Sequence, residues 1–149
     1  MGLYDYPAVG FHFAVAFELF PQSPVDMMFQ EVTGLSVTVG SETIVEGGEN
    51  RFVHKLPTRT EYSEIELKRG MFVGSGLVLW CIQAIENFEY QPTNLTITLL
   101  NEFHLPIAGW YVVNAFPVQW SITSLDAGKS EVVIESIKLS YNYFKTIRI

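Results

Sequence analysis

Apolar and polar residues alternate along most of the chain, which predicts β-strands with one buried face. In the stretch FHFAVAFELF, the apolar Phe11, Phe13, Val15 and Phe17 share one face, and smaller or polar residues take the other. The same alternation predicts strands over residues 28–46, 61–70, 94–103, 110–123 and 131–144. Most of the chain is therefore expected to be β-structure.

One segment, SGLVLWCIQAIENFEY, follows a helical period instead. Its apolar residues recur at offsets of three, four, seven, eight and eleven, which places them on one face of a helix. These residues are Leu77, Trp80, Cys81, Ala84, Ile85 and Phe88. Ser75 is the expected N-cap and Pro92 blocks continuation. We predict a helix over about residues 76–90, lying across a sheet or barrel end with Trp80 as its main anchor.

Seven or eight strands and this one helix are predicted, with no long linker, internal repeat or low-complexity tract. Gly34 is expected to break the strand pattern over residues 28–46, and Gly40 to form a bulge or bend in it. The pattern favours one mainly-β domain over residues 1–149, built as a sandwich or barrel.

Residues 46–70, EGGENRFVHKLPTRTEYSEIELKRG, form a strand-forming arm that has little to bury by itself. The stretch opens on a glycine pair, crosses Leu56-Pro57-Thr58 and then alternates polar and apolar residues. An exposed strand edge carries unpaired N–H and C=O groups, which makes it a template for another chain. We therefore expect the arm to be completed by a neighbouring copy of the same protein.

Composition supports a surface that is partly covered. Charged residues make up 17% of the chain, against about 25% in an average domain. The alternative is a monomer whose surface is rich in Ser, Thr and Asn. Aromatic residues are numerous, and the stretch from Trp110 to Trp120 contains two of the three Trp residues. Their expected role is in the core or at a subunit interface, with Trp110 beside Trp80 as a core anchor.

Charge and hydropathy limit the classes of function. The net charge of −7 disfavours binding to nucleic-acid phosphates. No stretch approaches the roughly 18 apolar residues that span a bilayer. The first ten residues lack the basic and apolar regions of a signal peptide. The single Cys81 cannot form an internal disulfide and fits a reducing compartment, so the chain is expected to be cytosolic when it is made.

Candidate chemistry is sparse, and no catalytic, cofactor or metal site is predicted. His12, His54 and His104 are scattered, and none has a second ligand at metal-binding spacing. Cys81 lies on the apolar helix face, where an inert packed thiol is expected. The stretch EGGENR lacks the Lys and the following helix of a phosphate-binding loop.

Two groups of carboxylates differ in their surroundings. Glu64 and Glu66 lie on one strand face beside Lys68, where simple solvated charge is expected. Glu135 instead shares its strand face with apolar residues, namely Val133, Ile137, Leu139 and Tyr141. A carboxylate in an apolar row needs a partner, or its pKa rises. We predict a buried ion pair between Glu135 and either Lys68 or Arg69.

The order of these features resembles the tail tube proteins of contractile phages and of phage-tail-like contractile injection systems. The likeness is carried by FQEVTGLSVTV, the glycine pair before HKLPTRTEYSEIELKRG, the helix with central Trp80, WYVVNAFPVQW and the closing strand EVVIESIKL. Together these motifs cover about residues 10–145. Phe116 stands where Trp is commoner in the family, and the C-terminal SYNYFKTIRI is less typical.

The resemblance implies two packed antiparallel sheets with a flanking helix and an extended β-hairpin arm. It also implies hexameric rings that stack into a hollow tube, with sheets joined edge to edge across subunits, and a structural role without catalysis. The arm, about residues 42–60, would reach over the adjacent subunit, with a positive φ at its glycine tip. The arm residues are Glu46, Gly47, Gly48, Glu49, Asn50 and Pro57.

The implied partners are other copies of the chain, contractile sheath subunits, baseplate or tube-initiating proteins, terminator proteins and cargo in the lumen. No cofactor, direct membrane insertion or specific nucleic-acid binding is implied. The chain would be in the bacterial cytoplasm during assembly, and afterwards in a phage tail or an extracellular injection particle.

The charge raises a second hypothesis. Six copies of −7 would carry −42 per ring, and so much charge cannot all face neighbouring subunits. A like-signed lumen would let anionic cargo slide without sticking, and an ordinary solvated surface is the alternative. The candidate lumen residues are Glu42, Glu46, Glu49, Glu61, Glu64 and Glu66.

The sequence leaves two other functions open. The first is a tube-initiating or baseplate subunit, or a type VI secretion tube protein, of the same fold. The second is a monomeric β-barrel that binds a small ligand in an internal pocket. Size-exclusion chromatography and negative-stain imaging would separate the monomer from the assembling proteins.

Overall fold

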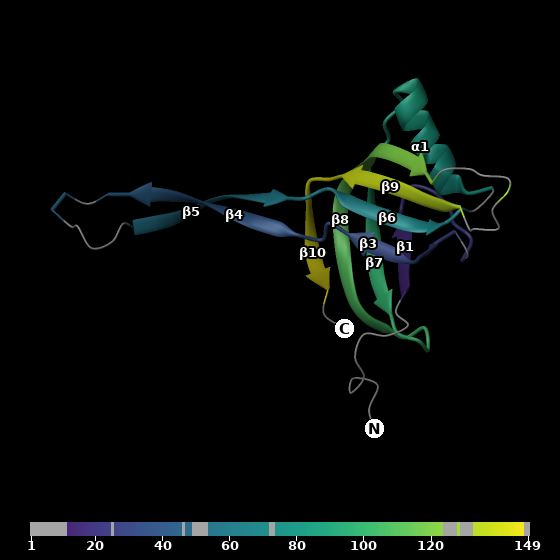
Figure 1. The fold of residues 1–149 in the computed structure, drawn as a ribbon, viewed down its shortest axis with the longest axis horizontal. Coiled ribbons are helices and arrows are strands. Elements are labelled where there is room, and N and C mark those ends of the chain that lie inside the picture. Colours follow the sequence, from purple (N-terminus) through teal and green to yellow (C-terminus); the bar gives the residue numbers. More distant parts are fainter. Residues whose placement is uncertain are drawn as a thin grey trace.

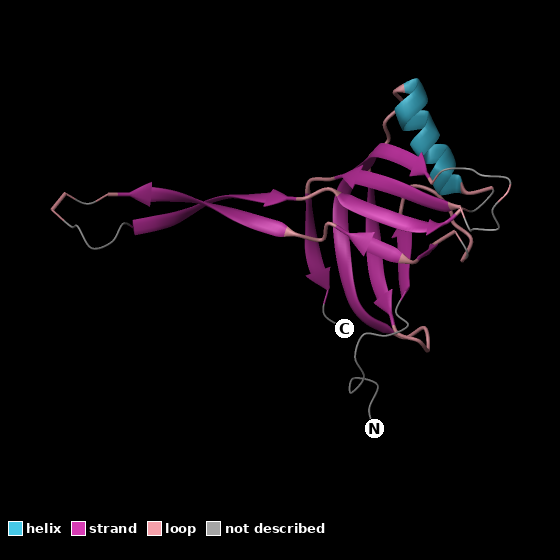
Figure 2. Cartoon of the chain, in the orientation of Figure 1, coloured by secondary structure: helices cyan, strands magenta, loops and turns pink. Residues whose placement is uncertain are grey.

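The computed structural model describes residues 12–24, 26–45, 47–48, 54–71, 74–123, 128 and 133–147. They form a mainly-β fold with one helix and two antiparallel sheets (Figures 1 and 2). The strands are β1 (His12–Phe17), β2 (Met28–Phe29), β3 (Glu31–Thr33), β4 (Val37–Ile44), β5 (His54–Tyr62), β6 (Ile65–Gly70), β7 (Thr93–Leu100), β8 (Pro106–Ile122), β9 (Ile134–Ser140) and β10 (Tyr143–Ile147). The helix is α1 (Gly76–Asn87).

The larger sheet has the strand order β2-β1-β7-β8-β9-β6-β3, with β10 also paired to β8. The 17-residue β8 belongs to two layers. Its first half pairs with β7 and β10, and its second half pairs with β9. Figure 2 shows the resulting barrel, in which β3, β6 and β9 cross steeply over β1, β7 and β10. The barrel therefore consists of two packed layers joined by one long strand.

The change of layer occurs at Asn114 in the middle of β8. Asn114 has a positive φ of 55°, a conformation that Asn adopts more readily than most residues. Its N–H donates to the side-chain carbonyl of Asn94 at 3.0 Å, so the kinked backbone keeps a hydrogen-bond partner. The NA dipeptide inside WYVVNAFPVQW thus marks the point where the strand leaves one layer for the other.

The prediction of one continuous strand over residues 131–144 is wrong. The structure has β9 ending at Ser140 and β10 starting at Tyr143, and both pair with the same edge of β8. Because β8 bends at Asn114, a strand that follows its edge must bend at the same level. Asn142 makes this turn, and its N–H donates to the carbonyl of Val113 at 3.0 Å.

The core lies between the two layers and under the helix. It is formed by Val15, Phe17, Phe29, Ile65, Leu67, Leu77, Trp80, Cys81, Leu95, Ile97, Val112, Ala115, Ile137 and Leu139. These residues occupy the apolar positions of the alternating strands and of one helix face, as the pattern predicts. Trp110 is partly buried and packs against this cluster.

The helix begins as predicted but ends earlier. The hydroxyl of Ser75 accepts from the N–H groups of Leu77 and Val78, which makes it the N-cap. The helix ends at Asn87 because Phe88 adopts a left-handed C-cap conformation with φ 55°. Phe88 was assigned to the buried face, but its side chain is 80% exposed.

Trp80 anchors the helix to the barrel, as its position in the pattern predicts. Its ring contacts Phe17 in an edge-on arrangement with centroids 5.3 Å apart, and its indole N–H donates to the Gln91 carbonyl at 2.9 Å. Trp80→Ala is expected to lower the free energy of unfolding by about 3–5 kcal/mol, measured by urea denaturation. Leu79→Ala is the control, since Leu79 is 58% exposed and a loss within about 0.5 kcal/mol is expected.

The second sheet is a two-stranded ribbon made of β4 and β5 alone. It projects from the side of the barrel as a long arm (Figure 1). The register shifts between Val39 and Ser41, so Gly40 lies at the predicted irregularity, and Cβ on Gly40 would approach Thr58 Oγ1 to 2.6 Å. The two strands of the ribbon cover residues 37–44 and 54–62, so the ribbon starts before and ends after the predicted arm of about 42–60.

Candidate assembly surfaces

The arm exposes apolar side chains along its length. Strand alternation puts Val37 and Val39 on one face of β4 and Ile44 on the other, and all three are exposed. Leu56 on β5 is also exposed, and Val45 is 70% exposed. A ribbon with solvated apolar groups on both faces is typical of a segment that another chain covers.

The arm tip is described in part. Gly47 and Gly48 lie in a turn, and Gly48 has a positive φ of 88°, which a glycine adopts without strain. Glu46, Glu49 and Asn50, the remaining predicted tip residues, lie outside the described residues.

The arm is fixed to the barrel at a tightly packed root. Gly34, with φ 88°, precedes β4, and a Cβ there would overlap the carbonyl oxygen of Glu64. On the other side, the ring of Tyr62 makes edge-on contacts with Tyr141 and Phe144 at centroid distances of 5.9 and 5.1 Å. The break predicted at Gly34 is thus the place where the chain leaves the barrel for the arm.

A hydrogen bond strengthens the same root. Tyr141 Oη donates to the Ser63 carbonyl at 2.6 Å. Partial burial, with a smaller effect from Tyr62, raises the pKa of Tyr141 to about 12. The hydroxyl therefore stays protonated and keeps donating across the physiological range. These contacts set the direction in which the arm leaves the barrel.

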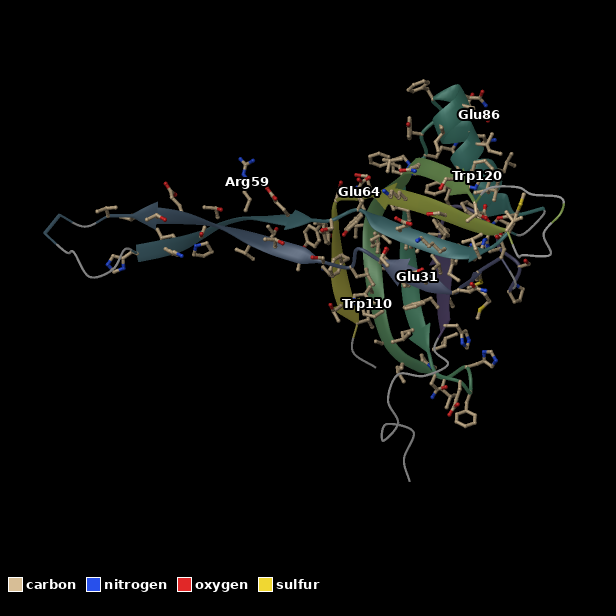
Figure 3. All side chains as sticks on the ribbon, in the orientation of Figure 1. Glu31, Arg59, Glu64, Glu86, Trp110 and Trp120 are labelled. Carbon is tan, nitrogen blue, oxygen red and sulfur yellow. The ribbon has the colours of Figure 1, made fainter. Side chains whose placement is uncertain are left out.

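The predicted lumen carboxylates lie in two places. Glu42 and Glu61 are exposed on the arm, and Glu64 is exposed at its root (Figure 3). Arg59 projects from β5 further out along the arm. Glu66 lies on the solvent face of β6, where its carboxylate accepts from Ser136 Oγ at 2.9 Å and lies 3.3 Å from Lys68 Nζ.

Glu66 is partly neutralised by its neighbours. The hydrogen bond from Ser136, together with Lys68 and Lys138, lowers the pKa of Glu66. The carboxyl of Glu66 is therefore ionised at neutral pH. Lys68 points to this solvent face, and so it is not the partner of Glu135.

Arg69 is the partner of Glu135, inside a buried polar network. Arg69 Nε donates to Glu135 Oε2 at 3.0 Å, and its Nη1 donates to Asp26 Oδ1 at 2.8 Å. Nη2 donates to the hydroxyl of Ser75 at 2.9 Å. Trp120 Nε1 donates to the second oxygen of Glu135 at 2.8 Å. One guanidinium thereby joins β6 and β9 to the N-cap of α1.

The network also explains how the helix is held over the barrel. All four of Asp26, Arg69, Ser75 and Glu135 are buried, and the Ser75 hydroxyl donates to Asp26 while capping the helix. Burial in low dielectric makes unpaired charge costly, so these groups depend on one another. The sequence gives no signal for a buried role of Asp26, because this residue lies between Pro24 and the start of β2, outside any alternating stretch.

Cys81 packs on the buried helix face. Burial, with a contribution from the charge of Glu135, raises the pKa of Cys81 to about 12. The thiol is therefore protonated at neutral pH, as expected of a packed side chain. No helix in the described part of the chain has the length and apolarity to cross a membrane.

Two histidines that are far apart in sequence meet in the structure. His12 Nε2 and His104 Nδ1 lie 2.8 Å apart, although 92 positions separate them in the chain. Sequence spacing gave no sign of this pair, because it depends on the pairing of β1 with β7. Within the described ranges, no group of three or more His, Cys, Asp or Glu side chains is placed to hold a metal ion.

The comparisons identify the family. The model of the T4-like virus tail tube protein gp19 matches residues 9–145. The chain belongs to this tail tube family. No curated protein sequence matches the chain.

Solved structures agree with this assignment. A chain from the cryo-EM structure of the anti-feeding prophage baseplate is 33% identical, with a TM-score of 0.80 over 96% of this chain and 97% of that one. A chain from the sheath-tube complex of the extracellular contractile injection system PVC is 26% identical, with a TM-score of 0.75 over 99% and 94%. Hcp1 from Flavobacterium johnsoniae is 12% identical, with a TM-score of 0.56 over 91% and 94%, and shares the fold. Structures similar to this chain thus include chains from the anti-feeding prophage and PVC particles.

Proposed function

We propose that this tail tube protein forms hexameric rings that stack into the inner tube of a contractile injection system. The observation that carries the proposal is the β4–β5 ribbon, which exposes apolar side chains on both faces. Within the described residues, β4 and β5 pair with each other alone. A neighbouring copy would cover the ribbon and bury surface such as Val39 and Leu56, which is favourable by about 25 cal/mol per Å².

The ring would also use an open sheet edge. Among the described strands, β10 pairs with β8 alone, so its other edge is open, whereas β2 and β3 are separated only by Gln30 and close the barrel between β1 and β6. An open edge presents free N–H and C=O groups, and a closed ring of subunits would satisfy them. Edge-to-edge pairing around a ring gives a continuous hydrogen-bonded wall, which would make the tube stiff.

The role proposed for the chain is mechanical and not enzymatic. The tube would be driven forward when a surrounding sheath shortens, so the energy would come from the sheath. The proposed partners are sheath subunits, baseplate or tube-initiating proteins, terminator proteins and cargo in the lumen. The chain would assemble in the bacterial cytoplasm and then act in an extracellular or phage-tail-like particle.

The lumen hypothesis now depends on fewer residues. Glu66 is held by Ser136 and two lysines, so Glu42, Glu61 and Glu64 are the described carboxylates that carry it. A negative channel would repel anionic cargo from its wall and keep it mobile. An assembled tube whose lumen surface is neutral or basic would contradict this hypothesis.

A second candidate is a tube subunit at the baseplate end. The identity of 33% to a chain from a baseplate structure, against 26% to a chain from a sheath-tube complex, favours it. Such a subunit would form a single ring or a short stack, whereas a main tube subunit would extend without limit. The monomeric ligand-binding alternative requires an internal pocket, but the space between the layers is filled by side chains such as Ile97 and Leu139.

Imaging of the purified protein tests the proposal. We expect negative-stain micrographs to show six-fold rings or tubes, and size-exclusion chromatography to show an apparent mass that rises with concentration. Long tubes would indicate the main tube subunit, and isolated rings the baseplate subunit. A monomer at every concentration would contradict both candidates.

A further inference from the structure

The start of β1 and the turn between β7 and β8 lie at the end of the barrel that is opposite α1 (Figure 1). His12 is the first residue of β1, and His104 lies in the turn that connects β7 to β8. Their ring centroids are 4.6 Å apart with an interplanar angle of 69°, and Nε2 of His12 faces Nδ1 of His104 at 2.8 Å. One imidazole nitrogen from the start of β1 and one from the β7–β8 turn therefore face each other.

Both rings are mounted on ordered backbone. The β7–β8 turn is held by Asn101, whose side-chain oxygen accepts from the N–H groups of Phe103 at 2.8 Å and Leu105 at 3.0 Å. The His104 N–H donates to the Asn101 carbonyl at 3.0 Å. His12 is fixed by its pairing with Leu100 in the sheet. Because the backbone at both positions is held by hydrogen bonds, binding an ion would mainly restrict the two side chains.

The facing nitrogens have the chemistry of a two-ligand metal site. Each neutral imidazole offers one lone pair, and a Zn²⁺ ion binds histidine nitrogen at about 2.0–2.1 Å. Tetrahedral coordination at that distance separates the two nitrogens by about 3.3 Å. The two rings would need to move apart by about half an ångström and to tilt, because each lone pair must point at the ion instead of at the other ring. The ion would replace the proton that the two nitrogens now share.

We propose that His12 and His104 form a bidentate site for a divalent transition metal of the class that imidazole favours, such as Zn²⁺, Cu²⁺ or Ni²⁺. Solvent would fill the remaining positions, because both side chains are accessible. Mg²⁺ and Ca²⁺ prefer oxygen ligands and would be poor occupants. The bound ion would tie the start of β1 to the β7–β8 turn, and it would stabilise the folded chain by mass action.

Zn²⁺ titration of the full-length chain by calorimetry tests the site. We expect one Zn²⁺ per chain and a melting temperature that rises with Zn²⁺ concentration, with no response to Mg²⁺. His12→Asn and His104→Asn should each weaken binding by at least the roughly 10–100-fold that loss of a supporting residue costs at metal sites. Asn is suitable at position 104 because His104 has a positive φ of 62°, which Asn tolerates.

His54→Asn is the matched control, since His54 is the third histidine and lies on the arm. This variant should bind Zn²⁺ like the parent chain. Electron paramagnetic resonance of a Cu²⁺-loaded sample should show coupling to two imidazole nitrogens, reduced to one by either site variant. Equal Zn²⁺ affinity in the parent and in the His12→Asn/His104→Asn double variant would overturn the proposal. Half an ion per chain, which indicates bridging between copies, would also overturn it.

Discussion

Deletion of the arm tip, Glu46 to Asn50, is expected to give a folded chain that no longer forms tubes. The barrel should survive, because β4 and β5 form a sheet of their own and the core residues all belong to the barrel and helix. The shortened arm would lose the reach with which it contacts the adjacent subunit. Electron microscopy would measure assembly, and circular dichroism with urea denaturation would measure folding.

Two further variants make the arm test sharper. Replacing residues 46–50 by five Gly and Ser residues keeps the length of the arm and changes only the tip sequence. Leu56→Asp keeps the whole arm and places a charge in the surface that the neighbour would cover. Leu56 is 47% exposed in the isolated chain, so this change should cost little folding free energy while it blocks assembly. Normal tubes from both the deletion variant and Leu56→Asp would contradict the idea that a neighbour completes the arm.

Much of the barrel could be predicted from alternation alone, because each of its strands has one buried face. The pattern placed Val15, Phe17, Ile65 and Leu67 inside, and all four are buried. It also indicated that the arm has little to bury, since a ribbon that projects from the barrel has no inner face. Period-two alternation depends only on which side of a strand is covered, so it is visible without knowledge of strand order.

Features that depend on strand order could not be read in this way. The division of residues 131–144 into β9 and β10 follows from the kink at Asn114, which lies in a different strand. The local pattern of residues 131–144 gives no sign of that kink. The contact between His12 and His104 requires β1 to pair with β7.

The partner of Glu135 is narrowed by the sequence to two neighbouring residues, Lys68 and Arg69, and alternation on β6 decides between them. Arg69 lies on the inner face with Leu67, while Lys68 lies on the outer face with Glu66.

The second large effect is expected at Arg69. Arg69→Met should lower the free energy of unfolding by about 3–5 kcal/mol or more, because it leaves Asp26 and Glu135 buried without the guanidinium between them. Asp26 is 3% and Glu135 1% exposed, so water cannot replace the lost charge. The Ser75 N-cap would lose a donor in the same change, which weakens the attachment of α1. Urea denaturation followed by tryptophan fluorescence would measure the loss, since Trp120 donates to Glu135.

Lys68→Met is the matched control for this prediction, because it removes a cation from the adjacent position of the same strand. Lys68 lies 3.3 Å from Glu66 on the solvent face, and a pair of that kind contributes about 0–1 kcal/mol. Adding Asp26→Asn and Glu135→Gln to Arg69→Met should restore part of the stability, since neutral amides of similar shape cost less to bury than unpaired carboxylates. If Arg69→Met and Lys68→Met lowered the free energy of unfolding equally, the idea that burial makes the Arg69 network more important for stability than a surface ion pair would be contradicted. A triple variant less stable than Arg69→Met alone would show instead that the hydrogen bonds of the two carboxylates outweigh their unpaired charge.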